Sequence, residues 1–345
     1  MPTRLVSFAL FFFVAALSVY LLVSGRELLI PLAIAVIIWY VINAMARAYG
    51  RIPFGTHHAP RWLTLSVALL TMLALLVLLV EMIGSNFAAV SKAAPEYQKN
   101  FEALIHKGAE LFGLEQTPTI TQLTDQIDTK TVLVQLGSAA AGVAGNIGVI
   151  VIYVAFLLIE QGSFERKMKA LFPEPEREQT ARKLLGRIQD DVQTYIWIKT
   201  ILSVLTGGIS YVFLLVVGVD FAEFWAVIIF FLNYIPTVGS ILGVIFPALL
   251  ALVQFPSFGP FLIIAVGLST AQMIIGNVLE PRLMGHSLNM SPLVVILSLA
   301  VWGSIWGVAG MFLCVPLTVI MMIVFAQFPQ TKPIAIALSS DGKVD

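Results

Sequence analysis

The residues best suited to chemistry are uncharged polar side chains inside a long apolar stretch. From Phe224 to Leu279 the chain has no Asp, Glu, Lys or Arg, and the segment Asn233-Tyr-Ile-Pro-Thr-Val-Gly239 lies in the middle. The amide of Asn233 offers donors and an acceptor in an otherwise dry setting. Such a group can hold a small polar solute, and we expect Asn233 to be the main solute contact.

The neighbours of Asn233 either assist binding or shape the backbone. Tyr234 and Thr237 are weaker hydrogen-bonding partners for a solute. Pro236 removes a backbone donor, and Gly239 tolerates dihedral angles that interrupt a helix. Lipid cannot satisfy the backbone groups that an interruption frees, so this segment must face buried protein or a water-filled cavity. We therefore predict a solute cavity beside a helix that ends within the membrane.

Further polar groups on the next apolar helix would complete an uncharged site. Thr270, Gln272 and Asn277 supply them, and the absence of charge there suits an uncharged solute better than an ion. Glu280 and Arg282 follow at the predicted cytoplasmic end of that helix. We expect these two residues to form an ion pair or to orient the end of the helix, with gating as the alternative role.

The composition places these residues in a lipid bilayer. Hydrophobic residues make up 59% of the chain, charged residues 12%, and the mean hydropathy is +0.93, values typical of a polytopic membrane protein. The formal net charge is zero, and nothing in it suggests a nucleic-acid partner. The single Cys314 cannot form an internal disulfide and lies in an apolar run, so we assign it to the core.

Apolar runs long enough to cross the hydrocarbon predict an all-α fold with about six full transmembrane helices. The predicted spans are 5–23, 28–46, 62–84, 142–159, 196–218 and 260–279. Two other apolar segments, 222–254 and 292–325, have the wrong length for one or two spans. Each is interrupted by glycine, at 233–239 and at 303–310. We predict that they are re-entrant helical hairpins of opposite orientation, although close helix packing through small residues is an alternative.

The charges outside the spans predict the orientation. Lys and Arg near span ends favour the cytoplasm, whereas acidic loops cross the membrane readily. The acidic stretch 85–141 is therefore a predicted extracytoplasmic helical domain, and the basic, amphipathic stretch 160–195 a cytoplasmic helical segment. Both termini are then cytoplasmic. The remaining parts are the helices of 1–84, the helix 142–159, a transport core over 196–328 and a tail over 329–345.

One carboxylate lies within a predicted span. Glu81 is close to the distal end of the third span, where it faces either the interface or a polar cavity. The interfacial location is the simpler interpretation. If transport is coupled to protons, however, Glu81 is the residue that we expect to carry them.

Several classes of protein are disfavoured by missing motifs. An ATP-driven pump needs a phosphate-binding Gly-x-x-x-x-Gly-Lys-Ser/Thr loop, and the sequence has none. The motifs of intramembrane proteases are also missing. The adjacent His57 and His58 have no Cys or carboxylate nearby, so we predict neither a metal site nor a cofactor. A passive channel or a scaffold of the cell envelope remains an alternative to a transporter.

Three motifs resemble the signature stretches of the autoinducer-2 exporter family of bacterial inner-membrane transporters. They are Asn233-Tyr-Ile-Pro-Thr-Val-Gly239, Gly276-Asn-Val-Leu-Glu-Pro-Arg-Leu-Met-Gly285 and Val315-Pro-Leu-Thr318. The likeness covers nearly the whole chain and is strongest from Tyr195 onward. Other residues that match the family pattern are Tyr195, Lys199, Thr200, Ser203, Thr206 and Gly207.

The resemblance implies a secondary transporter that forms homo-oligomers, and pentamers in particular. Better-known members of the family export a small, neutral, very polar quorum-sensing molecule, and other members resemble sodium/proton antiporters. The first 195 residues match in layout more than in motif. Because one fold can serve several solutes, membership alone does not identify the substrate.

Overall fold

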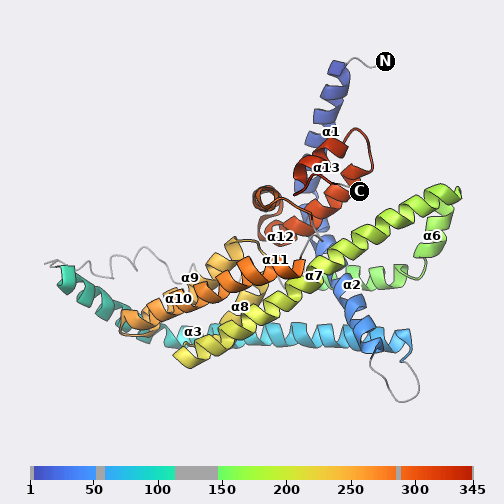
Figure 1. Cartoon of the computed structure of the whole chain (residues 1–345). Helices are drawn as coiled ribbons and strands as arrows, with labels where there is room; N and C mark the ends of the chain where they lie inside the picture. The colour runs from blue at the N-terminus through green and yellow to red at the C-terminus, as the bar shows by residue number, and fades with distance from the viewer. Residues whose placement is uncertain (1–3, 52–58, 113–146, 285–288, 344–345) are drawn as a thin grey trace. The chain divides into compact units, whose positions relative to one another are not determined.

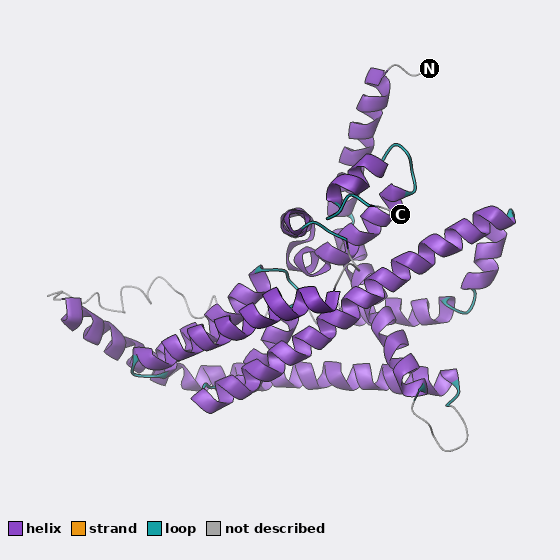
Figure 2. Ribbon diagram, viewed as in Figure 1, coloured by secondary structure: helices purple, strands orange, loops and turns teal. Residues whose placement is uncertain are grey.

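The computed structural model describes residues 4–51, 59–112, 147–284 and 289–343. Within these ranges the chain is helical, and its only β-type pairing is an isolated bridge between Met290 and Ser339 (Figure 2). The predicted all-α fold is confirmed for this part of the chain. Residues 113–141 of the predicted extracytoplasmic domain lie outside the described residues.

The helices follow the apolar runs of the sequence. The first half contains α1 (Arg4–Ser24), α2 (Arg26–Gly50), α3 (Arg61–Phe112), a helix over Ile147–Glu160 and α6 (Phe164–Leu171). The second half contains α7 (Pro175–Val217), α8 (Ala222–Leu232), α9 (Val238–Gln254), α10 (Phe258–Ile274), the π-helix η1 (Ile275–Leu279), α11 (Glu280–Met284), α12 (Pro292–Ala326) and α13 (Lys332–Leu338).

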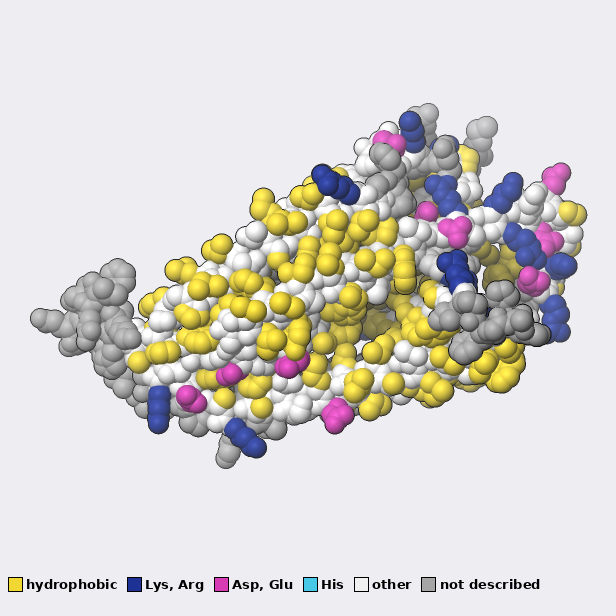
Figure 3. Space-filling view, turned by 60° about the horizontal axis from the view of Figure 1, so that its bottom comes forward, with side chains coloured by type: hydrophobic (Ala, Val, Ile, Leu, Met, Phe, Trp, Pro, Cys, Tyr) yellow, Lys and Arg dark blue, Asp and Glu magenta, His cyan; other side chains and the backbone are white. Residues whose placement is uncertain are grey.

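Among the described residues, five helices are long and apolar enough to cross a membrane, or six if a bent pair counts as one span. The number agrees with the predicted six, but the set differs. It includes Pro292–Ala326, which was predicted as a hairpin, whereas the first predicted span contains only the shorter apolar helix Phe12–Ser24. Large apolar side chains are exposed on these helices, among them Trp62, Val77 and Val216. They cover much of the face shown in Figure 3, where few charged side chains interrupt them. Exposed apolar surface of this extent is unusual for a soluble monomer and suits contact with lipid.

Two helices continue beyond the spans expected from hydropathy. The third predicted span lies within α3, which has 52 residues and extends to Phe112. The fifth lies within α7, whose 43 residues begin at Pro175 in the basic segment (Figure 1). The amphipathic helix predicted before residue 195 and the span predicted after it are therefore one unbroken helix.

The helices α8 and α9 meet at the predicted interruption and pack against each other. α8 ends at Leu232, and α9 begins at Val238. Thr237 has a φ of 59° and a ψ of −57°, and the N–H of Val238 donates to the carbonyl of Pro236. This is a γ-turn with positive φ, a rare and strained conformation for a β-branched residue.

A second interruption lies inside α12. Gly307 has a φ of 61° and a ψ of −139°, values that no helix adopts. Three residues later, a Cβ at Gly310 would overlap the carbonyl of Trp302. The break falls within the predicted segment 303–310, so both predicted interruptions are present in the backbone.

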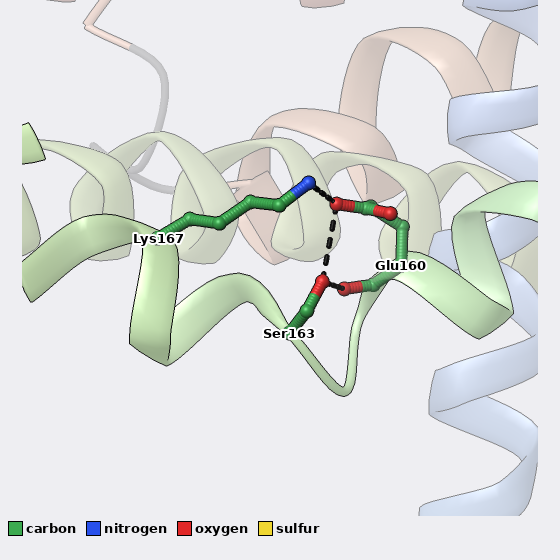
Figure 4. Close-up of polar contacts among 3 residues, drawn as sticks. All are labelled: Glu160, Ser163 and Lys167. Atoms are coloured by element: carbon green, nitrogen blue, oxygen red, sulfur yellow. Dashed lines mark hydrogen bonds and ion pairs between the residues drawn. The ribbon is translucent and has the colours of Figure 1, made fainter. Parts of the chain in front are cut away.

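A short turn bends the chain by 69° between the helix that ends at Glu160 and α6. Three exposed side chains hold this turn (Figure 4). The ammonium of Lys167 pairs with the carboxylate of Glu160, and the hydroxyl of Ser163 donates to the Glu160 carbonyl at 3.0 Å. The sequence Glu-Gln-Gly-Ser supplies the acceptors and the glycine that a sharp turn needs.

The chain forms two compact units. The first contains Met1–Ala44, Ala144–Ile196 and His286–Asp345. In it, α1 and α13 pack against α12, and the indole of Trp306 donates to the carbonyl of Leu22 at 3.0 Å. The indole of Trp302 donates to the Thr318 hydroxyl across the break in α12. Cys314 is fully buried there, in agreement with its predicted core position.

The second unit contains Met45–Val143 and Trp197–Gly285. Its apolar core comes from the C-terminal part of α7 and from α8, α9 and α10, with Leu214, Ile229, Ala251, Ile264 and Leu268 at its centre. The distal part of α3 joins this unit through polar contacts. Tyr97 donates to Asp220 at 2.8 Å, and the amide of Asn100 donates to the carbonyl of Gln254 at 2.8 Å.

Candidate functional site

A buried ion pair lies beside the interruption between α8 and α9. The ammonium of Lys199, on α7, is 2.6 Å from a carboxylate oxygen of Glu280 at the start of α11. It also donates to the backbone carbonyl of Asn233 at 3.3 Å. The Lys199 side chain is only 4% exposed, whereas that of Glu280 is 24% exposed. One positive charge therefore joins three separate elements of the second unit.

Neighbouring side chains on α7 hold the same interruption. The amide of Asn233 donates to the Ser203 hydroxyl at 3.1 Å, and the hydroxyls of Thr200 and Tyr234 are 2.7 Å apart. Residues four apart lie on one face of a helix, so Lys199 and Ser203 both reach Asn233. The close approach of the helices also needs Gly207, where a Cβ would be 3.0 Å from the carbonyl of Ala226.

The π-helix η1 determines the direction in which the Glu280 carboxylate points. It covers Ile275–Leu279 and directly precedes Glu280. A π-turn widens the helix by one residue and thereby shifts the direction of the side chains that follow. Such turns occur frequently at functional sites. Four of the five residues of η1 belong to the Gly276–Gly285 motif, so this motif has a structural role in presenting Glu280 to Lys199.

The groups around the C-terminal end of α8 favour a positive charge at the position of the Lys199 ammonium. The carbonyl groups at the C-terminal end of α8 carry partial negative charge, and Asn233 is the residue that follows the last turn. Lys199 is bonded there and at Glu280, so both of its contacts are with negative groups. The same ammonium would be costly to bury without these partners.

A profile of AI-2E family transporter proteins matches residues 5–330. The chain belongs to the AI-2E transporter family. It is 31% identical over 325 residues to "AI-2 transport protein TqsA" of Escherichia coli (strain K12), with 92% of this chain and 91% of the relative covered. It is 30% identical to a "Putative transport protein" of Haemophilus influenzae, with 91% and 90% covered. Membership of this family of transport proteins identifies a multi-pass membrane transporter and points away from an enzyme.

In this AI-2E family chain, some of the predicted site residues are buried and others are exposed. Asn233, Tyr234 and Gly239 are buried at the interruption, Pro236 is partly buried, and Thr237 is exposed. Gln272 is buried on α10, and its amide nitrogen would be 3.3 Å from a Cβ at Gly243. Thr270 and Asn277 are exposed, and the hydroxyl of Thr270 donates to its own helix at Val266. Three members of the predicted neutral site, Thr237, Thr270 and Asn277, are therefore exposed.

Two further predictions concern charged residues. Glu280 pairs with Lys199, not with the expected Arg282, whose side chain is exposed. Residues two apart on a helix point in different directions, whereas α7 supplies a partner for Glu280 from across the fold. The alternative roles of Glu280 and Arg282, orienting the helix end or gating, stay predictions. Glu81 is exposed on α3. Its predicted role in proton coupling stays a prediction.

The sequence analysis noted Lys199, Thr200 and Ser203 as matches to the family pattern, but it assigned none of them to the solute site. A signal was present in the sequence, because Lys199, Ser203, Thr206 and Ser210 recur every three or four residues in an otherwise apolar helix. All four are buried, so they form one polar stripe along α7.

Proposed function

We propose that this chain is a secondary transporter of the bacterial inner membrane that exports a small, neutral, polar solute such as the autoinducer-2 signal. The observation that carries the proposal is the contact between Lys199 and the carbonyl of Asn233, where a helix ends among buried polar groups. A helix end of this kind gathers backbone and side-chain polar groups that a solute can contact in place of their present partners. The name of the E. coli relative supplies the solute to test first.

In this proposal, α8 with α9 and the two parts of α12 are re-entrant hairpins of opposite orientation. Each has a residue of positive φ, Thr237 or Gly307, followed within three residues by a glycine against a backbone carbonyl. Repeated interruptions of this sort are typical of transporters that expose one site alternately to the two sides of a membrane. Asn233 then contacts the solute, and Tyr234 and Gln272 assist it.

Counterflow in proteoliposomes tests transport itself. Vesicles loaded with unlabelled autoinducer-2 should accumulate labelled autoinducer-2 against its gradient, because a carrier exchanges one molecule for another. A channel would only dissipate the gradient, and a scaffold would move nothing. Loss of accumulation in Asn233→Leu, with normal insertion, would assign the activity to this site. Metabolite profiles of cells with and without the protein would identify another substrate class if autoinducer-2 does not move.

A sodium/proton antiporter is the second candidate, and the Lys199–Glu280 pair specifically favours it. An exchanger of cations needs a carboxylate that releases a proton when a cation arrives, and Glu280 is partly accessible to water. In vesicles that contain a pH-sensitive dye, a pulse of sodium ions should then release protons without any organic solute. No response to sodium, with counterflow of autoinducer-2 intact, would reject this candidate.

The proposed topology has both termini in the cytoplasm and the distal part of α3 outside. Lys99 is exposed on α3, and Arg177 is exposed near the start of α7. In a Cys314→Ser background, a cysteine at position 99 should react with an impermeant reagent added to intact cells, and one at 177 should not. Reversed labelling would overturn the orientation.

The proposed homo-oligomer, a pentamer, is tested by native mass measurement of the protein in detergent.

A further inference from the structure

The two charges of the buried pair differ in their access to water. The Lys199 side chain is 4% exposed and that of Glu280 24% exposed. Glu280, at the predicted cytoplasmic end of its helix, is therefore the more accessible of the two groups to a proton from water, while the ammonium stays enclosed. Buried ion pairs contribute little to stability compared with apolar side chains, so their presence calls for another explanation. Ionisable residues inside a membrane are functional by default.

We propose that Glu280 is the proton-accepting residue of this transporter and that its protonation frees Lys199 to bind the oxygen atoms of a solute. This proposal deepens the proposed function, because it adds the coupling step to the same site. It also assigns coupling to Glu280 in place of Glu81, whose side chain is exposed on α3.

The step is a single proton transfer. One proton moves from water to the carboxylate of Glu280, which becomes neutral, and no other bond forms or breaks. The ion pair with Lys199 is then lost, while the ammonium keeps its bond to the carbonyl of Asn233. A buried ammonium without a counter-charge is unstable until oxygen atoms surround it. Water or a solute with hydroxyl or carbonyl groups must enter, and the interruption must open to admit it.

The surroundings of the pair suit this exchange. Lys199 is on α7, and the interruption contributes the carbonyl of Asn233 and the phenol of Tyr234, which is bonded to Thr200. On the same element as Glu280, the only other charged side chain is Arg282, which is exposed. An ammonium has three donors, so a freed Lys199 can hold two solute oxygens beside the amide of Asn233. The ligand class is a small uncharged molecule rich in hydroxyl or carbonyl oxygens.

A buried reporter close to the pair tests the opening without any solute. Ile235 is 5% exposed within the interruption. In a Cys314→Ser background, Ile235→Cys is labelled with a soluble maleimide in reconstituted full-length protein at neutral and at mildly acidic pH. Each rate is divided by the rate of the same cysteine in the denatured chain at that pH, which removes the titration of the thiol itself.

The expected rate is several-fold higher at acidic pH for the parent protein. Glu280→Gln mimics the protonated carboxyl, so its labelling should be fast at both pH values and independent of pH. Glu223→Gln is the matched control, since Glu223 is an exposed carboxylate on α8 itself. It should behave like the parent. A pH response that survives in Glu280→Gln, or one that disappears in Glu81→Gln, would overturn the proposal.

A transport measurement separates this proposal from the proposed function. Autoinducer-2 uptake into vesicles should depend on pH in the parent and lose that dependence in Glu280→Gln. If the parent does not move autoinducer-2 at all, the substrate assignment fails, and the labelling rates still decide the role of Glu280. If the parent moves it and labelling of Ile235→Cys never responds to pH, the coupling proposal fails alone.

Discussion

The α-carbon of Gly239 faces the carbonyl of Leu232 so closely that a methyl group there would overlap the carbonyl atoms. Gly239→Ala must therefore push α8 and α9 apart, at a cost of about 1–3 kcal/mol or more. We expect a lower melting temperature in detergent and loss of transport. Gly208→Ala is the control, because nothing lies within 4 Å of its added Cβ. That change should stabilise α7 by roughly 0.5–1 kcal/mol. Equal effects of the two changes would contradict the close approach.

Thr237 is the strained residue of the same interruption, with a φ of 59°. Glycine adopts positive φ without a steric penalty, and strain of this kind costs on the order of 1–3 kcal/mol. Thr237→Gly should therefore raise the melting temperature, even after the greater freedom of glycine in the unfolded chain is subtracted. Thr237→Val keeps the branched shape and should not. A lower melting temperature in Thr237→Gly would show that the hydroxyl matters more than the backbone.

Asn233 and Ser203 should be energetically coupled. Their hydrogen bond is buried, and each side chain loses its partner when the other is removed. A double-mutant cycle of Asn233→Ala and Ser203→Ala should give a coupling of about 0.5–1.5 kcal/mol in unfolding free energy. Thermal or denaturant unfolding in a fixed detergent measures it. Additive effects would mean that the two side chains act independently.

The contact between Tyr97 and Asp220 makes one phenol resistant to alkali. Burial, followed by the hydrogen bond to Asp220 and its charge, raises the pKa of Tyr97 well above its usual range. Because the pKa is raised on folding, the contribution to stability is complete below the ordinary phenol pKa of about 10 and is lost as the pH rises through the value in the folded protein. The contact is thus fully formed at neutral pH.

The absorbance of tyrosinate tests this shift. The difference between the alkaline titrations of the parent and Tyr97→Phe isolates one phenol, which should ionise later than ordinary tyrosines. Asp220→Asn removes the charge and should move that titration part of the way back, since burial remains. An ordinary titration for Tyr97 in the folded parent would show that α3 does not hold this contact in solution.

The sequence was sufficient for the features that depend on local patterns. Apolar length located the spans, and Pro236 with Gly239 located the interruption, because both effects act within a few residues. The partner of Glu280 depends on a contact between α7 and α11, which no local pattern contains. The burial of Lys199 could not be predicted for a related reason, because it depends on the helices that surround the residue.

The continuity of α7 also escaped prediction. Hydropathy changes near Ile196, so the basic segment and the apolar span were treated as separate elements. Nothing in the local sequence ends the helix there, since no proline or glycine lies near Ile196. A change of environment along a helix is therefore not a change of secondary structure.

Because α7 is long and unbroken, a movement at one end of the helix is transmitted to the other end. At 1.5 Å per residue, its 43 residues extend for about 65 Å, well over the roughly 40–45 Å of a whole bilayer. The N-terminal turns, with Arg177 and Arg182, then stand clear of the lipid, and Lys199 lies on the same rigid rod. An unbroken helix tilts or turns more easily than it bends. A change of tilt at the basic end would therefore be passed along the helix to Lys199, the partner of Glu280.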